Sequence, residues 1–225
     1  MNVAVWVPLL LSLKVALWAT GLNLVFGVAV AFGLSRWRSS WRDLVDSLLT
    51  LPLVLPPTVI GYYLLVLLGR RGVFGAVLER WGINPVFTWQ GAVIASTLVA
   101  FPLIQKAARA AFENVDPHLE SAARVLGLSE LAVFFRVSLP LAARGITAGA
   151  LLAFARALGE FGATLMFAGN LPGRTQTLSV AIFSAMAAGK DEGATVLVVV
   201  ASVTCVAVLL IAGRLAPDRS KLRIT

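Results

Sequence analysis

The stretch ESAARVLGLSELAVFFRVSLP, residues 120–140, decides the fold, because it is a charged, helix-forming interval in a chain that is otherwise apolar. Of the 225 residues, 59% are hydrophobic and only 13% are charged, and the mean hydropathy is +0.88. Soluble domains of ordinary composition have about a quarter of their residues charged. The composition therefore predicts a membrane protein whose polar interval needs a separate explanation.

The chain contains four windows that have no charged side chain and that reach the length of roughly 20 residues needed to cross a bilayer. They are Val15–Leu34, Ser47–Gly69, Trp81–Gln105 and Gly193–Gly213. A further span is hidden, since Arg156 and Glu160 interrupt its hydropathy. We therefore expect an all-α integral membrane protein in which residues 1–225 form a single transmembrane domain. We predict about five spans. They lie near residues 7–34, 44–68, 87–107, 141–167 and 193–213.

The basic residues predict the orientation, because cytoplasmic loops carry an excess of Lys and Arg. Five spans place the two ends of the chain on opposite sides. Twelve basic residues fall on the side of the tail and of the polar interval, and five fall on the other side. The twelve include Arg219, Lys221 and Arg223 of the tail. We expect the N-terminus outside and the polar interval inside. The net charge of +8 is therefore explained by membrane orientation, and we expect no nucleic-acid partner.

The polar interval has the signals of two short helices. Asp116–Pro117 is typical of a helix start, since Asp caps the first turn and Pro suits the first helical position. Gly127 predicts the end of that helix, and Ser129 predicts the cap of a second one. Leu139–Pro140 predicts the end of the second helix and the start of the next span. The expected pattern is helix, glycine elbow, helix and proline.

Two adjacent alanines, Ala122 and Ala123, let a partner protein approach the first of these helices closely. The alternative is a helix that lies on the inner leaflet, which would favour lysine-rich flanks and bulky apolar residues. The interval has mixed charge and no lysine. This composition favours docking to a protein.

The interval resembles the cytoplasmic coupling loop of ABC-transporter permeases, and we call residues 116–139 the coupling loop. In that family an acidic residue and two alanines precede a glycine, and Leu-Pro follows at a fixed distance. The matching residues are Glu120, Ser121, Ala122, Ala123, Gly127, Leu139 and Pro140. Ser121 stands where the family usually has Glu, and Glu120 is one position earlier. The resemblance implies that this loop inserts into a groove on a separate cytoplasmic ATPase.

The resemblance also implies the partners. No G-x-x-x-x-G-K-[ST] phosphate loop occurs in the chain, so we expect no ATP site of this kind on it. The sequence also has no credible catalytic cluster, and we expect no metal site, no bound cofactor and no enzymatic activity. ATP and Mg²⁺ would be used by the partner ATPase. Two copies of the chain would form the pore as a homodimer in the inner (plasma) membrane of a bacterium, and a periplasmic or surface binding protein would deliver the substrate.

Two further segments resemble the molybdate branch of the family, LPLVLPPTVIGYYLLVLLGRRG (51–72) and FARALGEFGATLMFAGNLPGRTQTL (154–178). Sulfate permeases share the Gly-Glu-Phe/Tyr-Gly core but usually continue with a serine and a β-branched run. Residues 163–166 are Ala-Thr-Leu-Met here, which favours molybdate. The alternatives are a sulfate or tungstate permease of the same family, or a stand-alone secondary carrier.

Several residues inside the predicted spans have two interpretations. Pro52, Pro56 and Pro57 predict a bend in the second span, either as a packing kink or as the lining of a pathway. Arg156 and Glu160 share one helical face, either as a structural ion pair or as a contribution to anion passage.

Small residues also mark the fourth span, and a short helix is expected in the outer loop. The stripe Gly145, Gly149, Ala153 and Ala157 predicts close helix packing, with the subunit interface as one location. Residues 178–188, in the loop 168–191, are expected to form a short helix. By resemblance, this loop would receive the binding protein.

Overall fold

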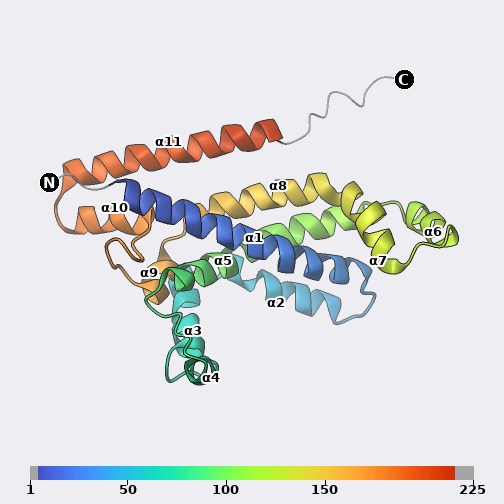
Figure 1. Ribbon diagram of the computed structural model, residues 1–225, viewed down its shortest axis with the longest axis horizontal. Helices are drawn as coiled ribbons and strands as arrows, with labels where there is room; N and C mark the ends of the chain where they lie inside the picture. Colours follow the sequence, from blue (N-terminus) through green and yellow to red (C-terminus); the bar gives the residue numbers. More distant parts are fainter. Residues whose placement is uncertain (1–4, 216–225) are drawn as a thin grey trace.

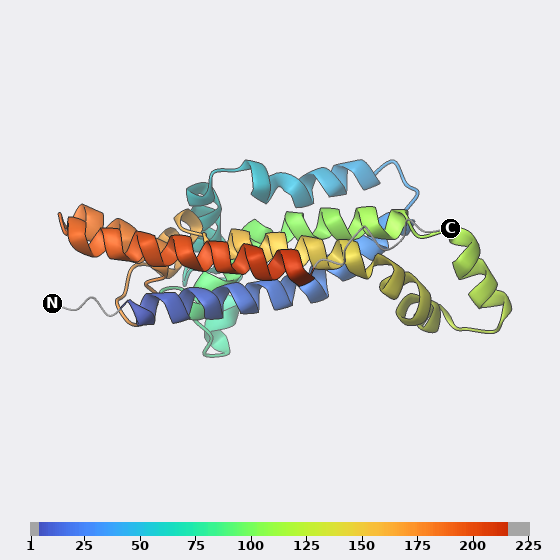
Figure 2. The ribbon, with the colours of Figure 1, turned by 90° about the horizontal axis from the view of Figure 1, so that it is seen from above.

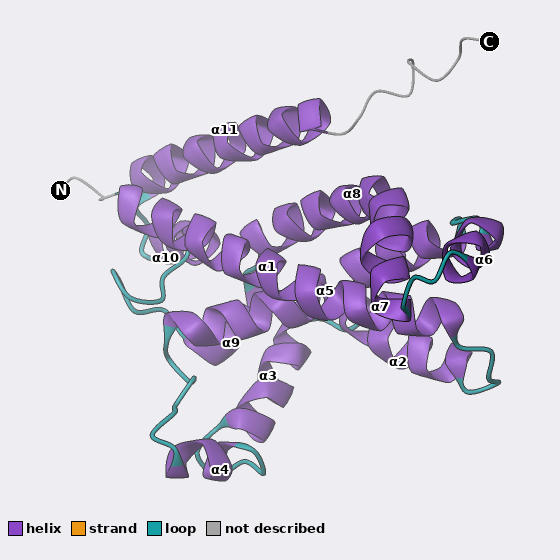
Figure 3. Ribbon diagram, turned by 45° about the vertical axis from the view of Figure 1, so that its right-hand side comes forward, coloured by secondary structure: helices purple, strands orange, loops and turns teal. Residues whose placement is uncertain are grey.

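The computed structural model describes residues 5–215, and within this range the regular structure is helical (Figure 3). The fold class is as predicted. The helices are α1 (Trp6–Arg36), α2 (Arg42–Val54), α3 (Pro57–Leu68), α4 (Gly75–Arg80), α5 (Trp89–Glu113), α6 (Pro117–Val125), α7 (Glu130–Val133), the π-helical turn η1 (Phe134–Ser138), α8 (Leu139–Leu158), α9 (Gly162–Ala168), α10 (Leu178–Ala187) and α11 (Asp191–Leu215).

The centre of the molecule is a bundle of α1, α5 and α8, which lie side by side in Figures 1 and 2. Small residues allow this close packing. A Cβ atom added to Gly145 would lie 2.5 Å from the Cβ of Ala111, and one added to Gly149 would lie 2.6 Å from the Cβ of Ala107. Ala153 and Ala157 are also buried. The predicted small-residue stripe therefore packs against α5 of the same chain and not against a second subunit.

The predicted span 44–68 is not one continuous helix. It consists of α2 and α3, which meet at an angle of 111°. The backbone is extended at Leu55 and Pro56, and Pro57 is the first residue of α3. Two successive prolines remove two N–H donors and disfavour the helical conformation of the residue before each of them. The predicted bend is thus present, and it is large enough to turn α3 away from the bundle (Figure 1).

The predicted span 141–167 is also interrupted. The helix α8 ends at Leu158, and α9 begins at Gly162 after a short irregular segment. At its other end, Pro140 does not end a helix as predicted, since α7, η1 and α8 follow one another directly. Within residues 5–215, four helical stretches are long and apolar enough to cross a membrane, and the bent pair α2–α3 would be a fifth. The four are Trp6–Arg36, Trp89–Glu113, Glu130–Leu158 and Asp191–Val208.

The two ends of the bundle differ in content (Figure 1). The coupling loop and the turn between α1 and α2 lie at one end, and α11 runs toward this end, with its last described residues partway along the bundle. The first turn of α1, the short helix α10 and the start of α11 lie at the other end. This arrangement agrees with an odd number of spans, and α10 confirms the short helix expected in residues 178–188. The basic tail residues Arg219, Lys221 and Arg223 lie outside the described residues.

Candidate functional site

The coupling loop has the caps that its sequence predicts. The carboxylate of Asp116 accepts a hydrogen bond of 2.9 Å from the backbone N–H of His118 at the start of α6. The hydroxyl of Ser129 accepts one of 3.4 Å from the N–H of Ala132 at the start of α7. Between them Gly127 has φ +85°, which residues with a side chain rarely adopt. The elbow therefore requires glycine because of the positive φ angle. Steric crowding is not the reason, since an added Cβ atom would meet nothing within 4 Å.

Pro140 is accommodated by a change of helix type. A proline inside an α-helix has no N–H to donate, and its ring crowds the carbonyl four residues earlier, which is that of Arg136. Immediately before Pro140, residues Phe134–Ser138 form a π-helical turn in which the N–H of Leu139 donates to the carbonyl of Phe134. The wider turn provides room for the proline without ending the helix. The coupling loop is consequently continuous with α8.

Glu120 is the buried polar centre of the coupling loop, with 3% of its surface exposed. Its carboxylate forms an ion pair with Arg36 at the end of α1 and accepts a hydrogen bond of 2.6 Å from the hydroxyl of Ser138 in η1. Arg124, one helical turn later, is more distant, with 3.8 Å between the charged atoms. Glu120 therefore connects three segments that are far apart in the sequence.

The position one residue later has a different environment. Ser121 is exposed, and its hydroxyl donates a hydrogen bond to the carbonyl of Pro117 in the same helix. The departure from the family pattern thus puts a local helix contact at residue 121 and the buried carboxylate at residue 120. Sequence reasoning could not find the role of Glu120, because its partners Arg36 and Ser138 lie in other helices.

An aromatic cluster holds the base of the coupling loop. The ring of Phe134 in η1 packs on that of Phe32 in α1, with 4.7 Å between their centroids, and Phe32 packs on Phe112 in α5 at 5.2 Å. Phe112 is fully buried. Edge-to-face contacts of this kind have defined geometry. Together with Glu120, this cluster fixes the loop to α1 and α5.

The tip of the coupling loop is apolar and exposed. Val125, Leu126 and Leu131 have 87%, 80% and 73% of their surface exposed. Ala122 is exposed as well, whereas Ala123 is buried within the chain, so the two alanines do not both face a partner as predicted. The structure thus offers Ala122 and three larger apolar residues for docking.

A salt bridge spans the elbow beneath this tip. The Nε of Arg124 donates a hydrogen bond of 2.7 Å to the carboxylate of Glu130. This hydrogen bond raises the pKa of the Arg124 guanidinium above its ordinary value. The pair is exposed to solvent and orients the two short helices rather than burying charge.

The predicted pair of Arg156 and Glu160 forms at the interruption between α8 and α9. Glu160 is 2% exposed, and its carboxylate accepts hydrogen bonds of 2.7 Å from Arg156 and 2.9 Å from the backbone N–H of Ala163. Because both carboxylate oxygens have a partner, the burial of the charge is compensated. This geometry supports the structural interpretation of the pair; a role in anion passage remains a prediction.

The bend at the prolines and the interruption at Glu160 are neighbours in space. A Cβ atom added to Gly162 would lie 3.0 Å from the Cβ of Pro57, and one added to Gly61 would lie 2.6 Å from the Cβ of Met166. The start of α3 thus packs directly on α9. Pro52 lies inside α2, away from the bend itself. The parts of the segments 51–72 and 154–178 that form α3 and α9 therefore pack together.

Residues 23–221 match the family model of the binding-protein-dependent transport system inner membrane component. The chain is 46% identical to the molybdenum transport system permease protein ModB of Escherichia coli K12 over 94% of this chain and 93% of that protein. It is 44% identical to a putative molybdenum transport system permease protein, YvgM, of Bacillus subtilis over 82% of each chain. A chloroplastic sulfate permease of Chlamydomonas reinhardtii is 39% identical over 82% of this chain and 50% of its own length.

Solved structures share the fold at low sequence identity. A chain of the MetNI methionine ABC transporter in an inward-facing conformation superposes with a TM-score of 0.72 at 16% identity, covering 94% of this chain and 92% of that one. A chain of a bacterial alginate ABC transporter, in complex with a pentasaccharide-bound periplasmic protein, gives a TM-score of 0.69 at 18% identity, covering 95% of this chain and 79% of that one.

Proposed function

The chain belongs to the family of binding-protein-dependent transport system inner membrane components, and from this premise we propose that it is the permease subunit of an ATP-driven molybdate importer. The observation that carries the proposal is the 46% identity to a molybdenum transport permease over nearly the full length of both chains. The coupling loop, with its fixed base and apolar tip, is the feature that such a subunit needs. The chain itself is a transport component and not an enzyme.

The coupling loop can transmit a displacement because its base is rigid. A partner ATPase that holds Val125, Leu126 and Leu131 would move α6 and α7 as one piece. Glu120 passes this movement to α1, and the direct continuation through η1 passes it to α8. ATP and Mg²⁺ belong to the ATPase in this scheme. The membrane subunit supplies only the mechanical connection and the pathway.

The pathway is proposed to lie between two copies of the chain. Within the described residues, the bundle of α1, α5 and α8 is filled by its own side chains, as Ala16, Ala100 and Ile104 at its centre are fully buried. The bent helix α3 instead presents Tyr62, Tyr63 and other apolar residues on its surface. Such a surface fits lipid or a second subunit. A homodimer would give the substrate a route that one copy does not enclose.

A tetrahedral dianion must cross a medium in which an isolated charge is very costly. Weak polar contacts are therefore preferable to a tight site inside the membrane. Arg156 is compensated by Glu160, so it would attract the anion less strongly than a lone arginine. We expect most of the selectivity to come from a separate binding protein outside the membrane.

The test is uptake by a reconstituted complex of the chain, its ATPase and its binding protein in proteoliposomes. Radiolabelled molybdate, tungstate and sulfate are compared with and without ATP. We expect ATP-dependent uptake of molybdate and of its near-isostere tungstate, and weaker uptake of sulfate. A preference for sulfate would assign the chain to the sulfate branch instead. Uptake that needs neither ATP nor the ATPase would identify a secondary carrier and refute the proposal.

A further inference from the structure

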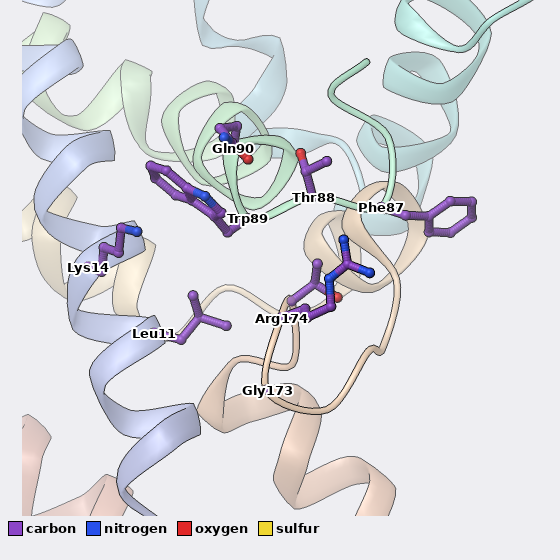
Figure 4. Close-up of a pocket in the computed structure, with 9 residues that line it drawn as sticks. Leu11, Lys14, Phe87, Thr88, Trp89, Gln90, Gly173 and Arg174 are labelled. Atoms are coloured by element: carbon purple, nitrogen blue, oxygen red, sulfur yellow. The ribbon is translucent and has the colours of Figure 1, made fainter. Parts of the chain in front are cut away.

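We propose that the pocket at the end of the molecule opposite the coupling loop binds a tetrahedral oxyanion, which it receives before the anion enters the pathway. The pocket has a volume of about 490 Å³ and is bounded by α1, the start of α5 and the loop between α9 and α10 (Figure 4). This assignment rests on the proposed function, since it names a place on the chain where the transported dianion first binds.

The charges of the pocket favour an anion. Lys14 comes from α1 and Arg174 from the loop after α9, so two cations from different segments line the same space (Figure 4). None of the nine lining residues is acidic, and in the described part of the chain neither cation forms an ion pair. Thr88 and Gln90 add a hydroxyl and an amide. This set provides charge and hydrogen-bond donors for several oxygens of one anion.

The position of Lys14 makes it an unusual cation. It lies eight residues after Trp6, the first residue of α1, which corresponds to about 12 Å along the helix. A charged residue at such a depth in a spanning helix without a carboxylate partner is a candidate for a functional role. Its ammonium lies 3.6 Å from the centre of the Trp89 ring, at the start of α5. The pocket is thus recessed below the start of α1.

The opposite wall is held in place by local hydrogen bonds and by one buried hydrogen bond to α1. The carbonyl of Leu171 accepts from the N–H of Arg174 at 3.0 Å, and the fully buried hydroxyl of Thr175 accepts from the N–H of Leu171 at 3.1 Å. The loop is fixed to α1 where the hydroxyl of Ser12 accepts from the N–H of Leu178 at 2.7 Å. Arg174 therefore sits on a preformed turn next to α1, and little ordering is needed when an anion binds.

The pocket suits weak and reversible binding. Lys14 and Arg174 are exposed, so an anion between them keeps part of its hydration shell. The volume of 490 Å³ can hold an oxyanion together with several water molecules, each of which takes about 30 Å³ in the liquid. Weak binding is what a transport pathway requires, because the anion must leave again. The alternative is that these cations contact acidic side chains of the binding protein.

The experiment measures equilibrium binding of radiolabelled molybdate to the full chain in complex with its ATPase in nanodiscs, without binding protein. Unlabelled tungstate serves as the competitor. The variants are Lys14→Gln, Arg174→Gln and the double variant. The matched control is Arg80→Gln, which removes an exposed cation of α4 that does not line the pocket. Capture of loaded binding protein and ATP-dependent uptake are measured on the same samples.

We expect each single variant to raise the Kd for molybdate roughly tenfold, because each removes one charge-assisted contact, while Arg80→Gln leaves it unchanged. Capture of the binding protein should be the same in all samples. Equal Kd values in all variants, or no saturable binding to the wild type, would refute the site. Loss of binding-protein capture in Arg174→Gln with molybdate binding intact would assign the cations to the protein partner instead.

The two proposals can fail separately. A wild-type complex that takes up molybdate but shows no binding sensitive to Lys14 and Arg174 would remove the site and keep the importer. A wild-type complex that binds molybdate in the pocket but transports none of the three oxyanions would keep the site and remove the importer.

Discussion

Glu120 shows how one carboxylate connects helices that are distant in the sequence. It is buried, and its partners Arg36 and Ser138 belong to α1 and η1. A buried charge is stabilising only as long as its partners remain, so removal of either side leaves a polar group without compensation. The strength of this connection can be measured at the level of single residues.

We expect Glu120→Ala to lower the stability of the chain by about 1–3 kcal/mol, because Arg36 and Ser138 lose their buried acceptor. The complex should also hydrolyse ATP without a matching rate of uptake. Thermal unfolding in detergent and the ratio of uptake to hydrolysis test these two effects. The control is Ser121→Ala, which removes an exposed hydroxyl bonded only within its own helix. Equal effects of the two substitutions would contradict the role given to Glu120.

The pair of Arg156 and Glu160 allows a similar experiment. Arg156→Ala leaves a buried carboxylate with one partner, the N–H of Ala163, and Glu160→Ala leaves that N–H unpaired. We expect each single variant to lose about 1–3 kcal/mol of stability, and the double variant to lose less than the sum. Recovery of uptake in the double variant supports a structural pair. If assembly is preserved but uptake is lost in Arg156→Ala and in the double variant, Arg156 acts in the pathway.

For single residues, the sequence predicted side-chain contacts between residues close in the chain. It did not predict contacts between different helices. The pairing of Arg156 with Glu160 follows from their spacing of four residues, and the caps at Asp116 and Ser129 follow from local chemistry. The partner of Glu120 lies 84 residues away in Arg36, and no local pattern indicates it.

Among the elements, the packing of α3 on α9 depends on glycine. A Cβ atom at Gly61 would lie 2.6 Å from that of Met166 and 3.0 Å from the carbonyl oxygen of Ala163. We expect Gly61→Ala to cost about 1–3 kcal/mol, because one of the two helices must move. Gly33→Ala in α1 is the control, since an added Cβ meets nothing within 4 Å there. Thermal unfolding of both variants decides the matter, and a neutral Gly61→Ala would show that the contact is loose.

The coupling loop offers an element whose surface can be changed without touching its base. We expect Leu126→Asp to weaken the association with the ATPase at least tenfold, because an exposed apolar side chain at the tip is replaced by a charge. The thermal stability of the membrane subunit alone should not change. Co-purification and titration of the ATPase measure the first effect. An undisturbed association would place the docking surface elsewhere on the chain.

The elements also show that proline patterns predict some breaks correctly and others wrongly. Pro56 and Pro57 were expected to bend a span, and they divide it into two helices. Pro140 was expected to end a helix, and the preceding π-helical turn lets the helix continue. Both outcomes depend on where the freed carbonyl groups and the proline ring find room, which only the packing of neighbouring helices determines.

For the whole molecule, the composition was sufficient to predict a helical membrane protein, while the orientation with the N-terminus outside stays a prediction. The count of spans was harder, because the predicted spans 44–68 and 141–167 are both interrupted. These interruptions contain charge or proline and lie in the middle of apolar sequence. Hydropathy averages over such residues and cannot show the direction that the chain takes after them.

The number of copies in the complex is a prediction at this scale. We expect the purified complex to contain two copies of this chain, because the described part of one copy has a filled bundle and an exposed apolar α3. Native mass spectrometry of the complex with its ATPase measures the stoichiometry directly. A complex with a single copy would mean that the pathway runs through one chain.

The π-helical turn η1 also affects how the coupling loop is rotated about the axis of α8. It holds one residue more than the α-helical geometry would, so all residues before it are rotated by about 100° around the axis of α8 compared with an uninterrupted α-helix. Deletion of one residue within 134–138 would remove this offset. The apolar tip would then be rotated to another position around the axis of the bundle. The extra residue in η1, together with the contacts of Glu120 and Phe134, therefore sets the angle at which the membrane subunit presents its coupling loop.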